Sequence, residues 1–276
     1  MKILGISRAE RFSPNSVERD RAVFSAVTER LRQANHSVET IGEDAFEIKS
    51  GYDAVFSMGR SENLLRKLLK MEEEGIPIIN SPSALQDNNR AQQAEIFKAA
   101  GVPIPETKID NGKGREMAYP FWLKSAASAQ QANDVCFVHN EETYRERIAE
   151  LRAGNTQDII LQVKHEEGDL VKFYGVEGTE FFSCSFPAEN GNFSKFGHEV
   201  HNSPLRKYDF SRSELQKAAN KAATLTNIAI YGGDAIVRPD GTFVIIDFND
   251  WPSFSACKDE AATHIAQKIL QIFNKQ

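Results

Sequence analysis

The stretch GGDAIVRPDGTFVIIDFNDWPSF, residues 232–254, carries acidic side chains where a hairpin normally packs apolar ones. Its Pro-Asp-Gly segment, residues 239–241, is typical of a turn. On either side lie β-rich runs, residues 235–238 and 242–248, with the composition of strands. The stretch therefore predicts two antiparallel strands joined by a tight turn, with carboxylates along them.

The acids of this hairpin predict a metal site. Side chains alternate along a strand, so Asp247 and Asn249 share one face, and a four-residue loop at 239–242 would set Asp234 opposite Asp247. Two carboxylates roughly 5 Å apart among apolar neighbours are unfavourable unless a cation or proton lies between them. Two Asp and one Asn offer the hard oxygens that suit Mg²⁺. The alternative is that these polar residues only end the strand and cap a turn before Pro252.

A second motif lies upstream. Residues 80–107, NSPSALQDNNRAQQAEIFKAAGVPIPET, join an Asn-Ser-Pro turn to a helix and then to Gly-Val-Pro-x-Pro-x-Thr. Together with the hairpin, this segment resembles the ATP-grasp superfamily, which binds its metal ions through an Asp on one strand and Glu-x-Asn on the next. The matching residues are Asp234, Asp247 and Asn249, with Asp in place of the commoner Glu. The resemblance covers about residues 80–276 and implies ATP and Mg²⁺, as one or two ions for which Mn²⁺ can substitute.

The resemblance also implies a set of nucleotide contacts. Residues 162–164 match the hinge strand that hydrogen-bonds adenine, and Lys124 and Lys172 match cations that the resemblance makes catalytic as well. The full set is Arg90, Lys124, Gln162, Val163, Lys164 and Lys172. Each polar member has a plain alternative: an exposed helix arginine, a lysine reaching solvent from a strand end, a glutamine facing water, or a surface ion pair.

Two departures from the superfamily pattern concern the phosphates. After Lys124 the superfamily usually has a Gly-rich loop that covers the phosphates, whereas this chain reads SAASAQQAND, residues 125–134, without glycine. The hydroxyls of Ser125 and Ser128 are the donors that would replace some backbone N–H groups. Many peptide-type ligases also carry Arg two residues before the first metal Asp, where this chain has Gly232.

Composition agrees with a globular enzyme. The net charge of −6 over 276 residues argues against a broad nucleic-acid surface. No apolar run approaches the roughly 20 residues that cross a bilayer, and the opening MKILGIS lacks a secretory apolar region. We therefore expect a cytoplasmic protein that binds neither nucleic acid nor membrane, with homo-oligomerisation left open. Its three cysteines have no metal-ligand spacing and are expected to be reduced.

The pattern along the chain predicts mixed α/β and α+β architecture. Strands at residues 1–7, 52–58 and 76–79 alternate with helices, which indicates a parallel sheet. From Tyr119 the order strand, loop, strand, helix, strand suits a small lid, and long strands return from about Val163. We expect an N-terminal pre-ATP-grasp-like α/β domain at 1–85, followed by an ATP-grasp fold of two subdomains: a small lid subdomain at 86–161 and a C-terminal subdomain with the metal site at 162–276.

Arginines follow two strands of the predicted parallel sheet. In open parallel sheets ligands bind beyond the carboxyl ends of the strands, where this chain has Arg8 and Arg60. The long loop at 187–208 adds His198 and Lys207. This placement predicts a small-molecule acceptor that is anionic, and the alternative is that these cations are solvated surface residues.

Three functions are consistent with the motifs. The first is an ATP-dependent ligase that activates a carboxylate as an acyl phosphate for attack by an amine, releasing ADP and phosphate. The second is an ATP-grasp kinase acting on a hydroxyl, which Asp247 and the sequence NDWPSF favour and which would release no free phosphate. The third is a nucleotide-binding module without turnover, which the missing glycines and Arg90 favour.

Overall fold

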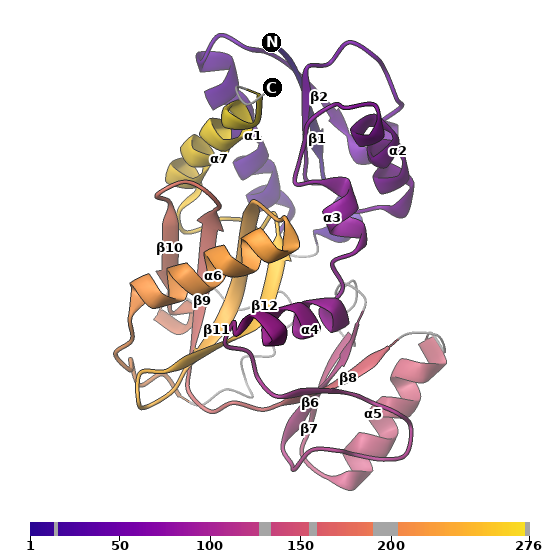
Figure 1. The fold of residues 1–276 in the computed structure, drawn as a ribbon, viewed down its shortest axis with the longest axis vertical. Coiled ribbons are helices and arrows are strands. Elements are labelled where there is room, and N and C mark those ends of the chain that lie inside the picture. The colour runs from indigo at the N-terminus through magenta and orange to yellow at the C-terminus, as the bar shows by residue number, and fades with distance from the viewer. Residues whose placement is uncertain (14–15, 127–133, 155–158, 190–203, 274–276) are drawn as a thin grey trace.

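The computed structural model describes residues 1–13, 16–126, 134–154, 159–189 and 204–273. Within these residues the chain forms three four-stranded sheets, each built from one part of the sequence. In Figure 1 the N-terminal sheet lies at the top, the small lid sheet at the bottom and the C-terminal sheet between them. No helix among the described residues is long and apolar enough to cross a membrane.

The N-terminal sheet is parallel, with strand order β2-β1-β3-β4. Its strands are β1 (Lys2–Ser7), β2 (Ser37–Gly42), β3 (Ala54–Ser57) and β4 (Ile78–Ile79). Its helices are η1 (Glu10–Phe12), α1 (Val17–Gln33), η2 (Glu43–Ala45), α2 (Glu62–Glu73) and α3 (Pro82–Gln86). The predicted parallel sheet is confirmed, but β2 was not expected because only Val38 of this edge strand is buried, so the strand lacks an apolar run.

The lid sheet is antiparallel, with strand order β5-β8-β6-β7. Its strands are β5 (Thr107–Ile109), β6 (Phe121–Ser125), β7 (Val135–Val138) and β8 (Ile160–Lys164). Helix α4 (Arg90–Ala100) leads into the lid and helix α5 (Glu141–Gly154) packs within it. The order strand, loop, strand, helix, strand is therefore the predicted one.

The C-terminal sheet is also antiparallel, with strand order β10-β9-β11-β12. Its strands are β9 (Asp169–Val176), β10 (Phe182–Ser185), β11 (Ile230–Val237) and β12 (Phe243–Asp250). The remaining helices are η4 (Pro187–Glu189), α6 (Arg212–Thr226) and α7 (Lys258–Phe273). The chain passes from the lid sheet to this sheet between β8 and β9, and the boundaries of the three expected domains stay a prediction.

One hydrophobic core joins the N-terminal sheet to the C-terminal part of the chain. Val23 and Val27 of α1 belong to the same buried cluster as Ile265 of α7, and Figure 1 shows these two helices side by side. Asn80 adds two buried hydrogen bonds to the backbone of Ile230, one in each direction and both 2.8 Å long. These contacts fix the N-terminal sheet relative to the C-terminal sheet.

A buried acid organises the lid. The Asp110 side chain is fully buried and accepts hydrogen bonds of 2.7 Å from Tyr144, Gln162 and Arg152. Because Asp110→Ala would leave these donors without their partner, it should lower the free energy of unfolding by about 3 kcal/mol. Denaturant titration measures this change.

Glu150→Ala is the matched control for Asp110→Ala. It also removes one acid from a lid ion pair, but that pair with Arg147 is solvent-exposed. The control should change little, because exposed pairs contribute little to stability. Equal midpoints for the two variants would contradict the structural role of Asp110.

Candidate functional site

The two acids of the hairpin face each other across the strands. Asp234 of β11 pairs with Asp247 of β12, as the sequence predicts. The turn is one residue longer than expected, because Val237 pairs with Phe243. A bulge at Ile246 then shifts the register back before the acids are reached. The predicted pairing is therefore correct at the acids, although the predicted loop length is wrong.

Lys124 is held by a hydrogen bond to the bulged residue, Ile246. The Lys124 Nζ of β6 donates to the Ile246 carbonyl oxygen at 2.9 Å, which links the lid sheet to the hairpin of β11 and β12. Burial lowers the pKa of Lys124 to about 8, opposed by the charge of Asp247 and assisted by that of Arg90. The ammonium is thus held beside the acids and remains mostly charged at neutral pH.

Nearby cations and an asparagine stabilise the ionised form of Asp247. The Arg90 Nε lies 4.0 Å from the Asp247 Oδ1, and the Asn249 Nδ2 donates to the Asp247 Oδ2 at 2.7 Å. Burial alone would raise the pKa of Asp247, but the charges of Arg90, Lys124 and Lys172 and the hydrogen bond from Asn249 together hold that pKa below its usual range. Asp247 is therefore ionised at neutral pH.

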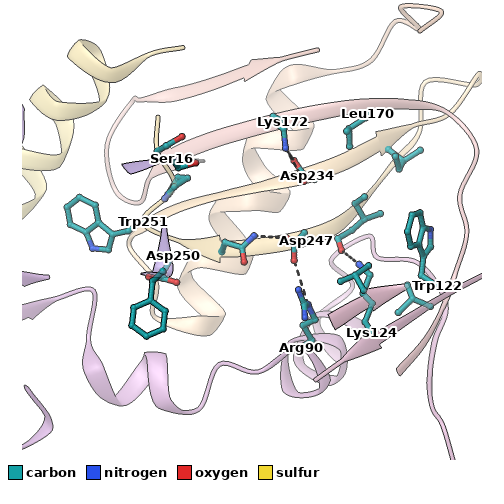
Figure 2. Close-up of a pocket in the computed structure, with 18 of the residues that line it drawn as sticks. Ser16, Arg90, Trp122, Lys124, Leu170, Lys172, Asp234, Asp247, Asp250 and Trp251 are labelled. Carbon is teal, nitrogen blue, oxygen red and sulfur yellow. Dashed lines mark hydrogen bonds and ion pairs between the residues drawn. The ribbon is translucent and has the colours of Figure 1, made fainter. Parts of the chain in front are cut away.

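Lys172 holds the second acid. It pairs across the strands with Asp234, and its Nζ lies 2.9 Å and 3.3 Å from the two Asp234 carboxylate oxygens. Lys172, Asp234 and Asp247 thus form a row across β9, β11 and β12, on one face of the sheet (Figure 2). Each carboxylate has a protein cation close to it.

A cavity of about 310 Å³ runs along this row of charges. Figure 2 shows Trp122 and Leu170 at one end, the acids with Arg90 and Lys172 in the middle, and Asp250 and Trp251 at the other end. The apolar end is lined by Trp122, Val135, Val163, Leu170, Ile236 and Ile246. The other end, called the polar end below, is lined by Arg8, Ser13, Ser16, Asp20, Arg60, Asp250 and Ser253, and also by Phe12, Trp251 and Pro252. The cavity therefore changes in character from apolar, through charged, to a mixture of charged, polar and apolar side chains.

Most of the residues expected at a site do line this cavity. They are Arg8, Arg60, Arg90, Lys124, Val163, Lys164, Lys172, Asp234, Asp247 and Asn249. Gln162 does not, because its fully buried side chain lies within the lid, bonded to Asp110 and to the backbone N–H of Glu116. Lys207 does not either: it is exposed and paired with Glu189. His198, Ser128 and the glycine-poor stretch 127–133 lie outside the described residues.

Arg8 lines the cavity, but all three of its side-chain nitrogens donate hydrogen bonds to protein groups. Its Nε donates to the Met58 carbonyl at 2.9 Å, its Nη1 to Asp20 at 2.8 Å and its Nη2 to the Trp251 carbonyl at 2.9 Å. Only 7% of its side chain is exposed. Arg8 therefore joins the N-terminal sheet to the end of the β11–β12 hairpin, and these contacts differ from the acceptor contact expected of it.

Several lining residues were not expected from the sequence. Trp122 stands two positions before Lys124 on β6, and Ile236 stands two positions after Asp234 on β11, so strand alternation alone places both on the cavity face. The Trp122 Nε1 donates to the His165 Nδ1 at 3.2 Å, which fixes the indole at the apolar end. Asp250 and Trp251 carry no such sequence pattern, since they lie where the strand ends.

The paired acids fit a divalent metal ion. Asp234, Asp247 and Asn249 offer carboxylate and amide oxygens on one face, the hard donors that Mg²⁺ prefers. Within the part of the chain that the structure describes, no three His, Cys, Asp or Glu side chains gather in a metal-binding group. That finding is compatible with the expected set, which has two carboxylates and one amide.

Comparisons with known proteins establish the fold. No protein-family model and no curated protein matches this sequence. Among solved structures, the chain resembles a RimK domain ATP-grasp protein from Sphaerobacter thermophilus DSM 20745, with a TM-score of 0.71 and 14% identity over 98% of this chain and 100% of that one. It also resembles the ATP-grasp ligase PsnB complexed with minimal precursor, Mg and ADP, with a TM-score of 0.64 and 15% identity over 99% and 98% of the two chains.

A third solved structure extends the likeness. N5-carboxyaminoimidazole ribonucleotide synthetase from Thermotoga maritima matches 98% of this chain and 76% of its own, with a TM-score of 0.66 and 15% identity. These matches cover nearly the whole chain, N-terminal sheet included. The protein therefore has the ATP-grasp fold, as its motifs predict.

Proposed function

We propose that this protein is an ATP-dependent ligase that activates a carboxylate as an acyl phosphate for attack by an amine. The observation that carries this proposal is the order of surfaces along this cavity (Figure 2): apolar walls, then cations and paired acids, then the end at Asp250, to which Arg60 is bonded. An adenine base fits the first surface, a magnesium triphosphate the second and a polar acceptor with an anionic group the third. The solved structure of PsnB with Mg and ADP supports the nucleotide and the metal.

The nucleotide end would bind ATP mainly by charge. Val163 and Leu170 would contact the base. Lys124, Arg90 and Lys172 would neutralise the triphosphate. Asp234, Asp247 and Asn249 would hold Mg²⁺, which supplies positive charge against the phosphate oxygens. Catalysis then rests on positioning and electrostatics, and no protein side chain is modified.

The chemical steps follow from that arrangement. A carboxylate oxygen of the acceptor attacks the γ-phosphorus, and ADP leaves. The amine nitrogen then attacks the acyl carbon, phosphate leaves, and the amine gives up a proton to form the amide. Lys124, as a charged ammonium, stabilises the negative charge on the transferred phosphoryl group.

Product analysis tests this function. The purified protein with ATP, Mg²⁺, candidate carboxylic acids and candidate amines should release ADP and inorganic phosphate in equal amounts, and full turnover should need both acceptors. Release of ADP without phosphate, with a hydroxyl compound as acceptor, would establish the kinase alternative instead. Tight nucleotide binding with no acceptor-stimulated release of ADP would establish a binding module.

Nucleotide affinity should depend on pH through Lys124. Phosphate oxygens favour its charged form, so bound MgATP raises the pKa of Lys124 from about 8 and takes up a proton. Affinity should therefore be highest below about pH 8 and fall above it, by up to about tenfold per pH unit. Calorimetry between about pH 7 and pH 9.5 measures this fall. Lys124→Arg keeps its charge in this range and should flatten the profile; a flat wild-type profile would contradict the assignment.

A further inference from the structure

Two arginines line the polar end of the cavity, and they differ in hydrogen bonding. Each of the three Arg8 side-chain nitrogens donates to a protein acceptor. Arg60 uses only its Nη2, which donates to the carbonyl oxygen and the Oδ1 of Asp250, both at 3.0 Å. The Arg60 Nε is buried without a partner, and no described residue accepts from its Nη1. Arg60, unlike Arg8, therefore keeps donors that no described protein group uses, and of these Nη1 is the one open to a ligand because Nε is buried.

Asp250 offers the opposite charge at the same place. Its Oδ1 accepts from Arg60, whereas its Oδ2 has no hydrogen-bond partner among the described residues. Both side chains line the cavity and are partly exposed, 25% for Arg60 and 16% for Asp250. The pair thus presents unused donors and an unused acceptor side by side.

The charges at this end are balanced. Arg8 pairs with Asp20, and Arg60 pairs with Asp250. A purely anionic group would gain from Arg60 but would also meet the carboxylate of Asp250. A group that carries an ammonium next to a carboxylate complements both members of the pair, through charge-assisted hydrogen bonds.

The distance to the metal hairpin separates the bound group from the reacting one. Asp250 lies three residues beyond Asp247 on β12, which is roughly 10 Å along an extended strand. A carboxylate held by Arg60 is therefore not the carboxylate that meets the γ-phosphate between the acids. If the molecule at Arg60 is the carboxylate acceptor, its reacting carboxylate therefore lies at its other end.

We propose that the acceptor is an α-amino dicarboxylic acid, bound by its α-carboxylate at Arg60 and its α-ammonium at Asp250. This inference rests on the proposed ligase function and names its substrate class. The side-chain carboxylate extends to the γ-phosphate and attacks it, ADP leaves, and the incoming amine displaces phosphate from the side-chain acyl group. The product is a side-chain amide with the α-groups unchanged.

The test is a calorimetric comparison of ligands on the protein saturated with Mg²⁺ and the non-hydrolysable nucleotide AMP-PNP. The probes are L-glutamate and L-aspartate, with glutarate lacking the ammonium and 4-aminobutanoate lacking the α-carboxylate. At least one of the two amino acids should bind. If it is L-glutamate, it should bind at least about tenfold tighter than glutarate or 4-aminobutanoate. If it is L-aspartate, succinate and 3-aminopropanoate are the matched analogues and the same margin applies.

Two variants assign the contacts. Asp250→Asn should weaken binding of the amino acid by about tenfold, whereas the dicarboxylate that lacks the ammonium should bind at least as tightly as to the wild type, because a repelling carboxylate is removed. Arg60→Gln should weaken binding of both the amino acid and that dicarboxylate. It should leave the affinity for the analogue that lacks the α-carboxylate unchanged. A purely structural role for either residue would change all the ligands alike. The comparison on the wild type tests the proposal even if a variant does not fold.

The contrary outcomes are distinct. If a ligand without the ammonium binds as tightly as its amino acid, or if neither amino acid binds to the nucleotide-saturated protein, the substrate class is wrong and the ligase proposal stands. If magnesium AMP-PNP itself does not bind, the proposed function is wrong, and this inference is overturned with it.

Discussion

Replacing Asp247 with alanine is expected to remove the metal dependence of nucleotide binding. Asp247 lies at the centre of the site: the charges of Arg90 and Lys124 stabilise its ionised form, and Asn249 donates a hydrogen bond to it. Without it, the face keeps a single carboxylate, Asp234, which is already paired with Lys172. Metal affinity should fall roughly a hundredfold or more, because even residues that only orient a metal ligand are worth about 10- to 100-fold.

Manganese binding measures this effect directly. Bound Mn²⁺ per chain, followed by electron paramagnetic resonance in the presence of ADP, should drop to background in Asp247→Ala. Asp240→Asn is the matched control, because Asp240 is an exposed acid in the turn of the same hairpin and only accepts from Thr242. It should bind Mn²⁺ as the wild type does. If Asp247→Ala binds Mn²⁺ as the wild type does, the metal site does not lie at the hairpin.

Replacing Arg8 with alanine is expected to destabilise the fold rather than only impair acceptor use. The change would leave Asp20, whose side chain is 8% exposed, without its cation, and two backbone carbonyls without their donor. Breaking a buried ion pair from one side costs about 3–5 kcal/mol. The denaturation midpoint of Arg8→Ala should fall accordingly.

A neighbouring arginine serves as the control. Arg11 also pairs with an acid, Asp44, but its side chain is 51% exposed. Arg11→Ala should therefore unfold near the wild-type midpoint. If Arg8→Ala keeps the wild-type midpoint yet loses acceptor binding, Arg8 contacts the acceptor, and the structural assignment is wrong.

The acids of the hairpin could be predicted because local rules determine them. Turn residues separate the strands, and alternation places Asp247 and Asn249 on one face. The bulge at Ile246 could not be predicted, because it compensates for a turn that is one residue longer than expected. The longer turn and the bulge shift the register in opposite directions, so Asp234 still pairs with Asp247 although the predicted loop length is wrong.

The roles of the two arginines could not be separated from the sequence. Both follow strands of a parallel sheet, as the pattern predicts. What distinguishes them is long-range: Arg8 bonds the Trp251 carbonyl 243 residues away, and Arg60 bonds Asp250 190 residues away. Only the folded chain shows that the hydrogen-bonding capacity of one is used and that of the other is not.

Gln162 shows a limit of strand alternation. Alternation places Gln162 on the sheet face opposite that of its neighbours, where it could point to water. Residues 110–116 instead cover that face, and Gln162 is buried in hydrogen bonds to Asp110, Gly114 and Glu116. A local pattern does not encode which distant segment covers a face of the sheet.

The most direct test of the account is a calorimetric titration of the wild-type protein with ATP, with and without Mg²⁺. The account predicts binding of one ATP per chain, much tighter with Mg²⁺ than without it, and loss of that difference in Asp247→Ala. A correctly folded wild-type protein that binds no ATP under either condition would contradict the central claim that this cavity is a magnesium-nucleotide site.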